Sequence, residues 1–226
     1  MAIPALFTLS SYAQTFADSL TAVLKKKSVN ETETFILKSK HMDAQPVLYR
    51  QIVGDYFEYS FEARTSPGYK ICFLGKGDTI VYSEVLSGKK KIIENESAAG
   101  LKEFYTSYGT FFGTNGINIK MFFTDTVRYG RGCGFAGVDP PERKRSKKLL
   151  DALNAKTFLI WLRSPVTEDQ LYAVEGLTEL EKRGYKLKPQ TKKVIDFIKT
   201  KKGKAKTCNG CIYSDREISE IFTDKN

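Results

Sequence analysis

The sequence contains little histidine, little cysteine and no long hydrophobic run. Its 226 residues include one histidine, His41, and four cysteines. A single histidine excludes His-rich metal centres and two-histidine nuclease sites, and a serine or cysteine triad would have to use that one side chain. The apolar runs are short, as in residues 158–162, whereas a membrane-spanning helix needs about 20 residues. We therefore expect no membrane-spanning segment.

The cysteines are too few for a disulfide scaffold, and residues 1–16 have no basic n-region of the kind that begins a secretory signal. We therefore expect reduced thiols and an intracellular location, either cytoplasmic or nuclear. Cys208 and Cys211 form a C-x-x-C pair, which is half of a zinc site, and Cys133 is the most plausible third ligand. Ordinary turn thiols, a zinc site and a redox dithiol all stay open, and no other cofactor is expected.

The pattern of apolar residues predicts helices first, then a sheet, then mostly helices. Helices are expected at residues 11–26, 97–108, 143–153, 167–183, from Pro189, and after Ser214. Strands are expected at residues 34–38, 47–53, 56–64, 69–74, 79–86, 91–94, 117–123 and 157–162. Ser11 with Gln14, Thr167 with Gln170, and Ser214 with Glu217 are spaced as capping boxes. The aromatic residues of the predicted sheet either form its core or make a stacking platform for bases, and the alternation favours core for Phe57, Tyr59 and Phe61.

These elements predict an α+β fold. An antiparallel β-sheet, either a meander or a partial barrel, would occupy the N-terminal half over residues 1–125 together with the first helix. A basic, mostly helical part would follow over residues 126–226, with its own core or sharing the first.

Positive charge is concentrated in one segment, Lys182–Lys206. This segment has eleven Lys or Arg and one acidic residue, Asp196. Its net charge of +10 equals the net charge of the whole chain. Because lysine is a point charge, such a segment favours contacts with phosphates over readout of base edges. An apolar helical face that includes Val194 and Ile198 should anchor its middle, and residues 201–206 are expected to be mobile. A solvated lysine-rich surface and an acidic protein or lipid partner are the other interpretations.

A glycine-rich loop precedes a second group of basic residues, over residues 128–148. Backbone amides of such a loop can approach a phosphate, and a helix N-terminus adds partial positive charge. Cations in the first turn of the helix that follows oppose its dipole, so an anion nearby would relieve the conflict. The segment matches neither the P-loop nor the Rossmann pattern. A plain exposed loop is the alternative.

The sequence favours a non-catalytic protein that binds DNA or RNA through phosphate contacts with little sequence preference. Both a monomer and a homo-oligomer stay open. The residues expected to contact nucleic acid are Arg128, Arg131, Arg143, Lys144, Arg145, Lys147, Lys148, Lys188, Lys192, Lys193, Lys199, Lys201, Lys202, Lys204 and Lys206. One alternative is a metal-dependent nuclease or other phosphate-handling enzyme that uses carboxylates of the sheet, with candidates Asp55, Glu58, Glu62, Asp78 and Glu84. A second is a viral or phage assembly protein that coats nucleic acid.

Overall fold

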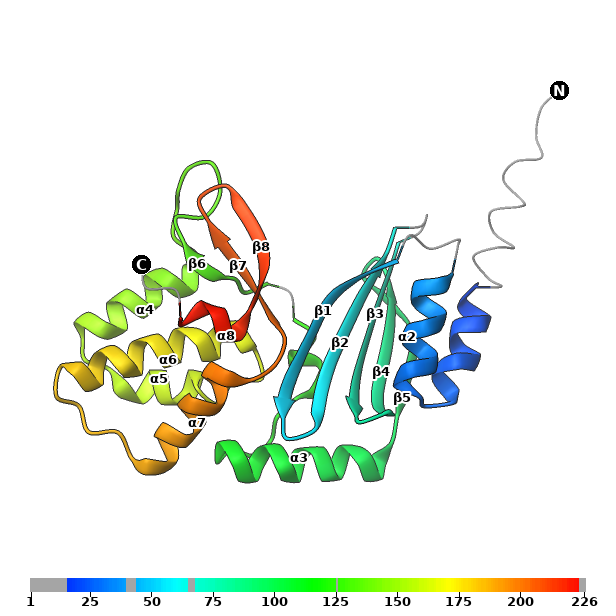
Figure 1. The fold of residues 1–226 in the computed structure, drawn as a ribbon, viewed down its shortest axis with the longest axis horizontal. Helices are drawn as coiled ribbons and strands as arrows, with labels where there is room; N and C mark the ends of the chain where they lie inside the picture. Colours follow the sequence, from blue (N-terminus) through cyan, green and yellow to red (C-terminus); the bar gives the residue numbers. More distant parts are fainter. Residues whose placement is uncertain (1–15, 40–43, 65–67, 125, 224–226) are drawn as a thin grey trace. The chain divides into compact units, whose positions relative to one another are not determined.

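The chain forms two compact units in a computed structural model that describes residues 16–39, 44–64, 68–124 and 126–223. Unit 1 comprises the described residues through Tyr49 together with Asp55–Phe104. Unit 2 comprises Arg50–Gly54 and the described residues from Tyr105 onward. The boundary between the units therefore falls within strand β1 (Ala44–Val53) and within helix α3 (Ala98–Phe112) (Figure 1).

The main feature of unit 1 is a five-stranded sheet in the order β1-β2-β3-β4-β5. The strands after β1 are β2 (Tyr56–Ala63), β3 (Tyr69–Lys76), β4 (Thr79–Ser87) and β5 (Lys90–Glu96). From β2 to β5 each strand pairs antiparallel with the next. The predicted antiparallel sheet in the N-terminal half is thus confirmed, and its strand order is that of a meander.

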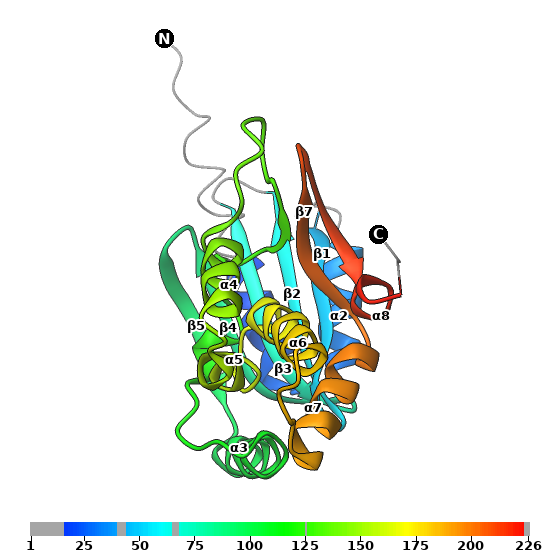
Figure 2. The same cartoon turned by 90° about the vertical axis from the view of Figure 1, so that its left-hand side faces the viewer.

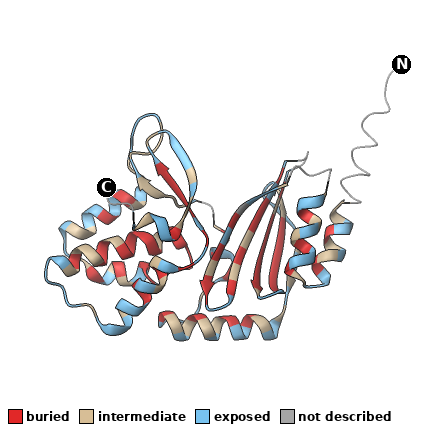
Figure 3. Ribbon diagram, in the orientation of Figure 1, coloured by how far each residue is buried: buried red, intermediate tan, exposed pale blue. Residues whose placement is uncertain are grey.

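Two helices cover one face of this sheet and build the core of unit 1. Residues 16–25 are helical, as predicted, whereas the expected capping pair Ser11 and Gln14 lies outside the described residues. Leu20 and Leu24 of this helix belong to a buried cluster that also includes Phe61, Ile71 and Phe73 of the sheet. The buried positions on the strands are visible in Figure 3.

The second helix, α2 (Val29–Lys38), replaces the strand predicted at residues 34–38. Ser28 caps it by accepting a hydrogen bond from the Glu31 N–H at 3.2 Å. Val29, Thr32 and Ile36 are its buried residues, a spacing of three and four that places them on one helical face. The prediction was wrong because a short apolar run such as residues 35–37 does not distinguish a strand from one side of a short helix.

Unit 2 is mostly helical, as predicted, and surrounds one buried helix. Its elements after α3 are η1 (Ile119–Met121), β6 (Tyr129–Arg131), α4 (Pro141–Asp151), α5 (Ala155–Trp161), α6 (Thr167–Lys182), α7 (Pro189–Thr200), β7 (Lys204–Asn209), β8 (Ile212–Glu217) and α8 (Ile218–Ile221). Helix α6 contacts α4, α5, α7, β6 and β7. Most of its residues are buried, so α6 is the centre of the unit 2 core (Figure 3).

Several elements of unit 2 differ from the predictions. The strand expected at residues 157–162 is helix α5, because the Asn154 side chain caps it through the Thr157 N–H at 3.1 Å. The strand expected at residues 117–123 contains the short helix η1. Residues 204–206, expected to be mobile, form part of β7, which lies between a parallel β6 and an antiparallel β8.

None of the helices in the part of the chain that the structure describes is long and apolar enough to span a membrane.

Candidate nucleic-acid interface

Helix α7 presents lysines on the side opposite to its buried face. Pro189 is the first helical residue, where its missing N–H leaves no hydrogen bond unmade. Val194, Ile195 and Ile198 are buried. Since 3.6 residues make one turn, Lys192, Lys193 and Lys199 fall on the outer half of the helix. The docking of this helix by its apolar face is as the sequence predicted.

Two lysines of the predicted interface are buried. Lys201 is 2% exposed, and its ammonium group donates hydrogen bonds to Thr167 Oγ1 and Gln170 Oε1, both at 2.9 Å. Lys206 is 7% exposed, and its backbone N–H donates to Glu168 Oε1 at 2.9 Å. These residues hold β7 and the preceding turn against the start of α6, so we withdraw them from the interface.

The hydrogen bonds of Lys201 also explain why a predicted capping box is absent. Thr167 and Gln170 were expected to cap α6, but Val166 is its N-cap residue and no side chain caps it. The oxygens of Thr167 and Gln170 accept from the Lys201 ammonium group instead. The buried Lys201 ammonium group therefore binds the side-chain oxygens that the capping-box pattern assigned to backbone N–H groups.

The remaining lysines of this region form an exposed, uncompensated group, which we name the lysine surface. It consists of Lys186, Lys188, Lys193, Lys199, Lys202 and Lys204. Lys199 is half-buried and the other five are exposed. Among the described residues, no acidic group lies within ion-pair distance of any of these six ammonium groups.

The neighbouring cations of the same region are paired. Lys182 and Arg183 bind Glu179 at 3.5 Å and 3.1 Å, and Lys192 binds Glu181 at 2.5 Å. Lys192 therefore has an internal partner, unlike Lys193 beside it. The pairs of Glu179 have the i,i+3 and i,i+4 spacing that the sequence itself displays. The pair of Lys192 with Glu181 joins α7 to α6 and has no such local signal.

The cations of the second predicted patch are largely used to hold the glycine-rich loop. Arg143 is 4% exposed, donates to the Gly130 carbonyl oxygen at 2.9 Å, and pairs with Glu175 at 2.7 Å. Arg131 binds the other oxygen of Glu175 at 2.9 Å. Burial acts to raise the pKa of Glu175, but the charge of Arg143 together with hydrogen bonds from Arg143, Tyr129 and Arg131 outweighs burial, so the pKa lies below its usual value. Arg143 is therefore a structural residue, contrary to the prediction that it contacts phosphate.

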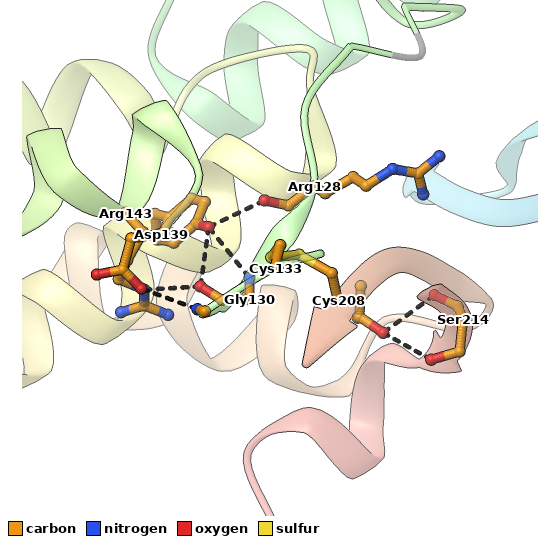
Figure 4. Close-up of a disulfide and its surroundings, with 10 residues drawn as sticks. Arg128, Gly130, Cys133, Asp139, Arg143, Cys208 and Ser214 are labelled. Atoms are coloured by element: carbon orange, nitrogen blue, oxygen red, sulfur yellow. Dashed lines mark hydrogen bonds between the residues drawn. A yellow bond between two sulfur atoms is a disulfide. The ribbon is translucent and has the colours of Figure 1, made fainter. Parts of the chain in front are cut away.

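The amides of this loop have acceptors within the chain. The Gly132 N–H donates to Asp139 Oδ1 at 2.9 Å, and Figure 4 shows Asp139 beside the loop. Lys147 binds the other oxygen of that carboxylate at 2.6 Å. The Gly130 N–H donates to the Tyr172 hydroxyl at 3.1 Å. Glu175 and Asp139 supply the anions that the basic first turn of α4 requires, so the phosphate-cradle interpretation loses its main argument.

Four further residues of this patch remain near the surface. Lys144, Arg145 and Lys148 are exposed on α4. The Arg145 guanidinium lies 5.1 Å from the centre of the Trp161 ring. The guanidinium of Arg128, a half-buried residue, lies 5.4 Å from the centre of the Tyr213 ring.

The two predicted patches lie on either side of α6. Helices α4 and α7 each contact α6, and Figure 2 shows α6 between them. The basic residues of α4 therefore do not extend the lysine surface into one groove.

The cysteines form a disulfide where a zinc site was expected. Cys133 and Cys208 are bonded, with their Cα atoms 5.5 Å apart (Figure 4), and Cys211 is an exposed free thiol. A bonded sulfur is not a thiolate ligand, so this set cannot bind zinc as predicted. No group of three or more His, Cys, Asp or Glu residues in the described ranges could hold a metal ion. The expectation of reduced thiols is also corrected for this pair.

The five carboxylates proposed for a nuclease site differ in their burial and in their hydrogen-bond partners. Glu58 and Glu84 are buried within unit 1, at 1% and 7% exposure, whereas Asp55 and Glu62 are exposed. Asp78 accepts hydrogen bonds from Ser28 Oγ at 3.0 Å and from the Asn30 N–H at 2.8 Å at the start of α2. Asp78 thus has a structural role.

Glu84 is a buried carboxylate of β4 that shares a hydroxyl group with an exposed carboxylate of β5. It lies opposite Glu94 in the sheet, and the Tyr82 hydroxyl is 2.9 Å from Glu84 Oε2 and 2.8 Å from Glu94 Oε1. Burial and the nearby Glu94 carboxylate raise the pKa of Tyr82. A hydroxyl has one proton and so donates to one of the two oxygens at a time.

One buried ion pair was missed by sequence reasoning. Arg50 of β1 and Glu168 of α6 are joined at 3.0 Å, with side chains 1% and 2% exposed. The Arg50 guanidinium also donates to the Phe122 carbonyl oxygen at 3.3 Å. Nothing in the local sequence marks either residue, because 118 positions separate them.

No protein-family model matches the chain, and neither a curated protein nor a solved structure matches it.

Proposed function

We propose that this protein binds nucleic acid without catalysis, through phosphate contacts made by the lysine surface. The observation that carries the proposal is the set of six ammonium groups in unit 2 that lack an acidic partner among the described residues. Neighbouring cations such as Lys192 are neutralised by acids of α6. The surplus charge is therefore located at specific exposed positions, where a polyanion would supply the missing counter-charge.

The chemistry of the surface indicates which part of a nucleic acid it contacts. All six residues are lysines, whose compact charge binds phosphate oxygens without the bidentate geometry that reads guanine. We therefore propose little sequence preference. An intracellular location belongs to the same proposal.

In a reducing compartment, Cys133 and Cys208 would be thiols, but the glycine-rich loop has other attachments. The Cys133 N–H donates to the Val138 carbonyl oxygen at 2.9 Å, and the Gly134 N–H donates to that of Gly210 at 2.7 Å. Neither hydrogen bond requires the sulfur atoms. The proposal does not depend on the redox state of this pair.

The salt dependence of binding tests the proposal. The variant Lys188→Gln/Lys193→Gln/Lys202→Gln removes three exposed charges of the lysine surface. Each lost phosphate contact lowers the slope of log K against log [salt] by about 0.9 on duplex DNA, so the slope should fall by up to about 3. Fluorescence anisotropy with labelled DNA or RNA at four salt concentrations provides the measurement.

A control variant separates the surface from net charge. Lys25→Gln/Lys89→Gln/Lys90→Gln removes three exposed lysines of unit 1 and changes the net charge equally. The control should retain most of the affinity. Equal weakening by both variants would refute the lysine surface as the binding site, and absence of salt-dependent binding by the unmodified protein would refute the function.

A further inference from the structure

An exposed apolar tip projects from unit 2, beyond the lysine surface. We call it the aromatic tip, and it consists of Phe135, Val138, Ile212 and Tyr213. Their exposures are 100%, 49%, 69% and 55%. Exposed apolar side chains that gather at one place mark an interaction site more often than scattered ones do.

Two segments distant in sequence build this tip and are fastened to each other. The loop after β6 carries Phe135, and the β7–β8 hairpin carries Tyr213; the two project together in Figure 1. The Cys133–Cys208 disulfide joins them, and the Gly134 N–H donates to the Gly210 carbonyl oxygen at 2.7 Å. The rings are thus presented by an ordered scaffold, which lowers the entropic cost of binding a flat ligand.

A close approach of the backbone completes this fastening. Gly130 of β6 lies opposite Cys208 of β7, and a Cβ at position 130 would overlap the Cys208 carbonyl oxygen. The absence of a side chain therefore lets the two strands lie close enough for the disulfide. Glycine is required here for space.

The tip combines exposed rings with positive charge. The Arg128 guanidinium lies 5.4 Å from the centre of the Tyr213 ring. Arg131, in β6 just before the loop, is paired with Glu175 at 2.9 Å, so Arg128 is the cation beside the rings. An aromatic face beside a guanidinium group suits a ligand that has both a flat π-system and a negative charge.

Strand β7 links the tip to the lysine surface. Lys204 begins this strand, and its last residue, Asn209, pairs with Ile212 of the tip. At about 3.4 Å per residue, the strand places Lys204 roughly 17 Å from the turn. This span fits a binding site several nucleotides long.

From these observations we infer that the aromatic tip stacks unpaired bases, so that single-stranded nucleic acid is the preferred ligand. The inference rests on the proposed function and specifies its substrate class. Bases in a duplex are stacked on one another and their faces are closed to protein rings, whereas bases of a single strand are open to them. Stacking is tolerant of sequence, which agrees with a surface that contacts phosphates.

Binding to labelled dT20 and to a 20-base-pair duplex at equal salt tests the inference. The unmodified protein should bind dT20 more tightly. Phe135→Ala and Tyr213→Ala should each weaken dT20 binding by roughly fivefold to 150-fold, the range for loss of one stacked base, with an unchanged salt slope. Phe135→Leu keeps an apolar side chain but removes the ring, so it should weaken dT20 binding nearly as much as Phe135→Ala does.

Controls and outcomes separate the inference from the proposed function. Ile160→Ala truncates an exposed apolar residue of α5, 60% exposed, and should leave dT20 binding unchanged. Equal affinity for dT20 and duplex, or full affinity in Phe135→Leu, overturns the inference while the lysine surface stands. Loss of binding to anionic phosphatidylserine vesicles in Phe135→Ala, without a preference for dT20, would assign the tip to a lipid surface and also overturns it. Salt-independent or absent binding to both probes refutes the proposed function itself.

Discussion

Removing the guanidinium of Arg50 should destabilise unit 2 strongly, because it leaves the Glu168 carboxylate buried without that counter-ion. The two side chains are 1% and 2% exposed and their charged atoms lie 3.0 Å apart. Breaking a buried ion pair by removing one partner costs about 3–5 kcal/mol. Arg50→Met keeps the apolar stem of the side chain, so the cost reports the lost charge and its hydrogen bonds. For a domain of this size, the loss corresponds to roughly 6–20 °C in Tm.

Urea unfolding followed by tryptophan fluorescence measures this cost in unit 2 specifically. Trp161 is the only tryptophan in the chain and is 7% exposed within that unit. Arg183→Met is the matched control, because it removes the same group from an exposed pair with Glu179 at 3.1 Å. Exposed pairs contribute about 1 kcal/mol or less, so the control should change stability little.

A double-mutant cycle identifies the origin of the effect. Glu168→Gln keeps an acceptor for the Lys206 N–H, which donates to this side chain at 2.9 Å. Since Arg50→Met and Glu168→Gln remove the same interaction, their combined cost should fall short of the sum by about 2 kcal/mol or more. A cost below about 1 kcal/mol for Arg50→Met, or additivity within about 0.5 kcal/mol, would show that the pair does not stabilise unit 2.

Two further substitutions test other parts of unit 2. Burial raises the pKa of Asp169 from 3.8 to about 6, with the Ser164 hydroxyl at 2.9 Å opposing the shift. The proton is therefore held more tightly in the folded state, and the associated stability is complete below about pH 4 and lost as the pH rises to about 6. Asp169→Asn should thus match the unmodified protein near pH 3.5 and exceed its stability above pH 6 by up to about 3 kcal/mol, measured by urea unfolding across pH; a constant difference would contradict the shifted pKa. Gly130→Ala places a Cβ within 2.7 Å of Cys208 Sγ, so it should lower Tm and raise the thiol count of the denatured, unreduced protein above that of the unmodified chain, whereas Arg131→Ala should not raise the thiol count. An unchanged thiol count and Tm in Gly130→Ala would refute the close approach of β6 to β7.

The elements that the sequence predicted correctly have long and regular patterns of apolar residues. Helix α7 was predicted from Pro189 and its buried residues, and the sheet from five successive alternating segments. Short apolar segments were misread, because residues 34–38 and 157–162 fit a strand and one face of a helix equally well. The side chains of Ser28 and Asn154 cap these two helices. The caps mark the segments as helical, which the spacing of their apolar residues does not.

The hairpin of β7 and β8 had a signal that the prediction overlooked. Asn209-Gly210 is a dipeptide typical of tight hairpin turns, and Gly210 has a φ of 57°. The strand β7 was not predicted because its two lysines, Lys204 and Lys206, are of a residue type depleted in strands and the charge suggested a mobile segment. The burial of Lys201 and Lys206 follows from acceptors on α6, which no local pattern could reveal.

The disulfide also determines how unit 2 would carry a mechanical load. Cys133 and Cys208 are 75 positions apart, and the bond closes a ring that contains α4, α5, α6 and α7. Tension applied to the two ends of the chain would pass through the sulfur atoms and bypass those four helices. At about 3.3–3.6 Å per extended residue, the ring withholds roughly 250 Å of contour length until the bond is reduced. While the bond remains intact, tension along the chain cannot extend the segment that contains all six residues of the lysine surface.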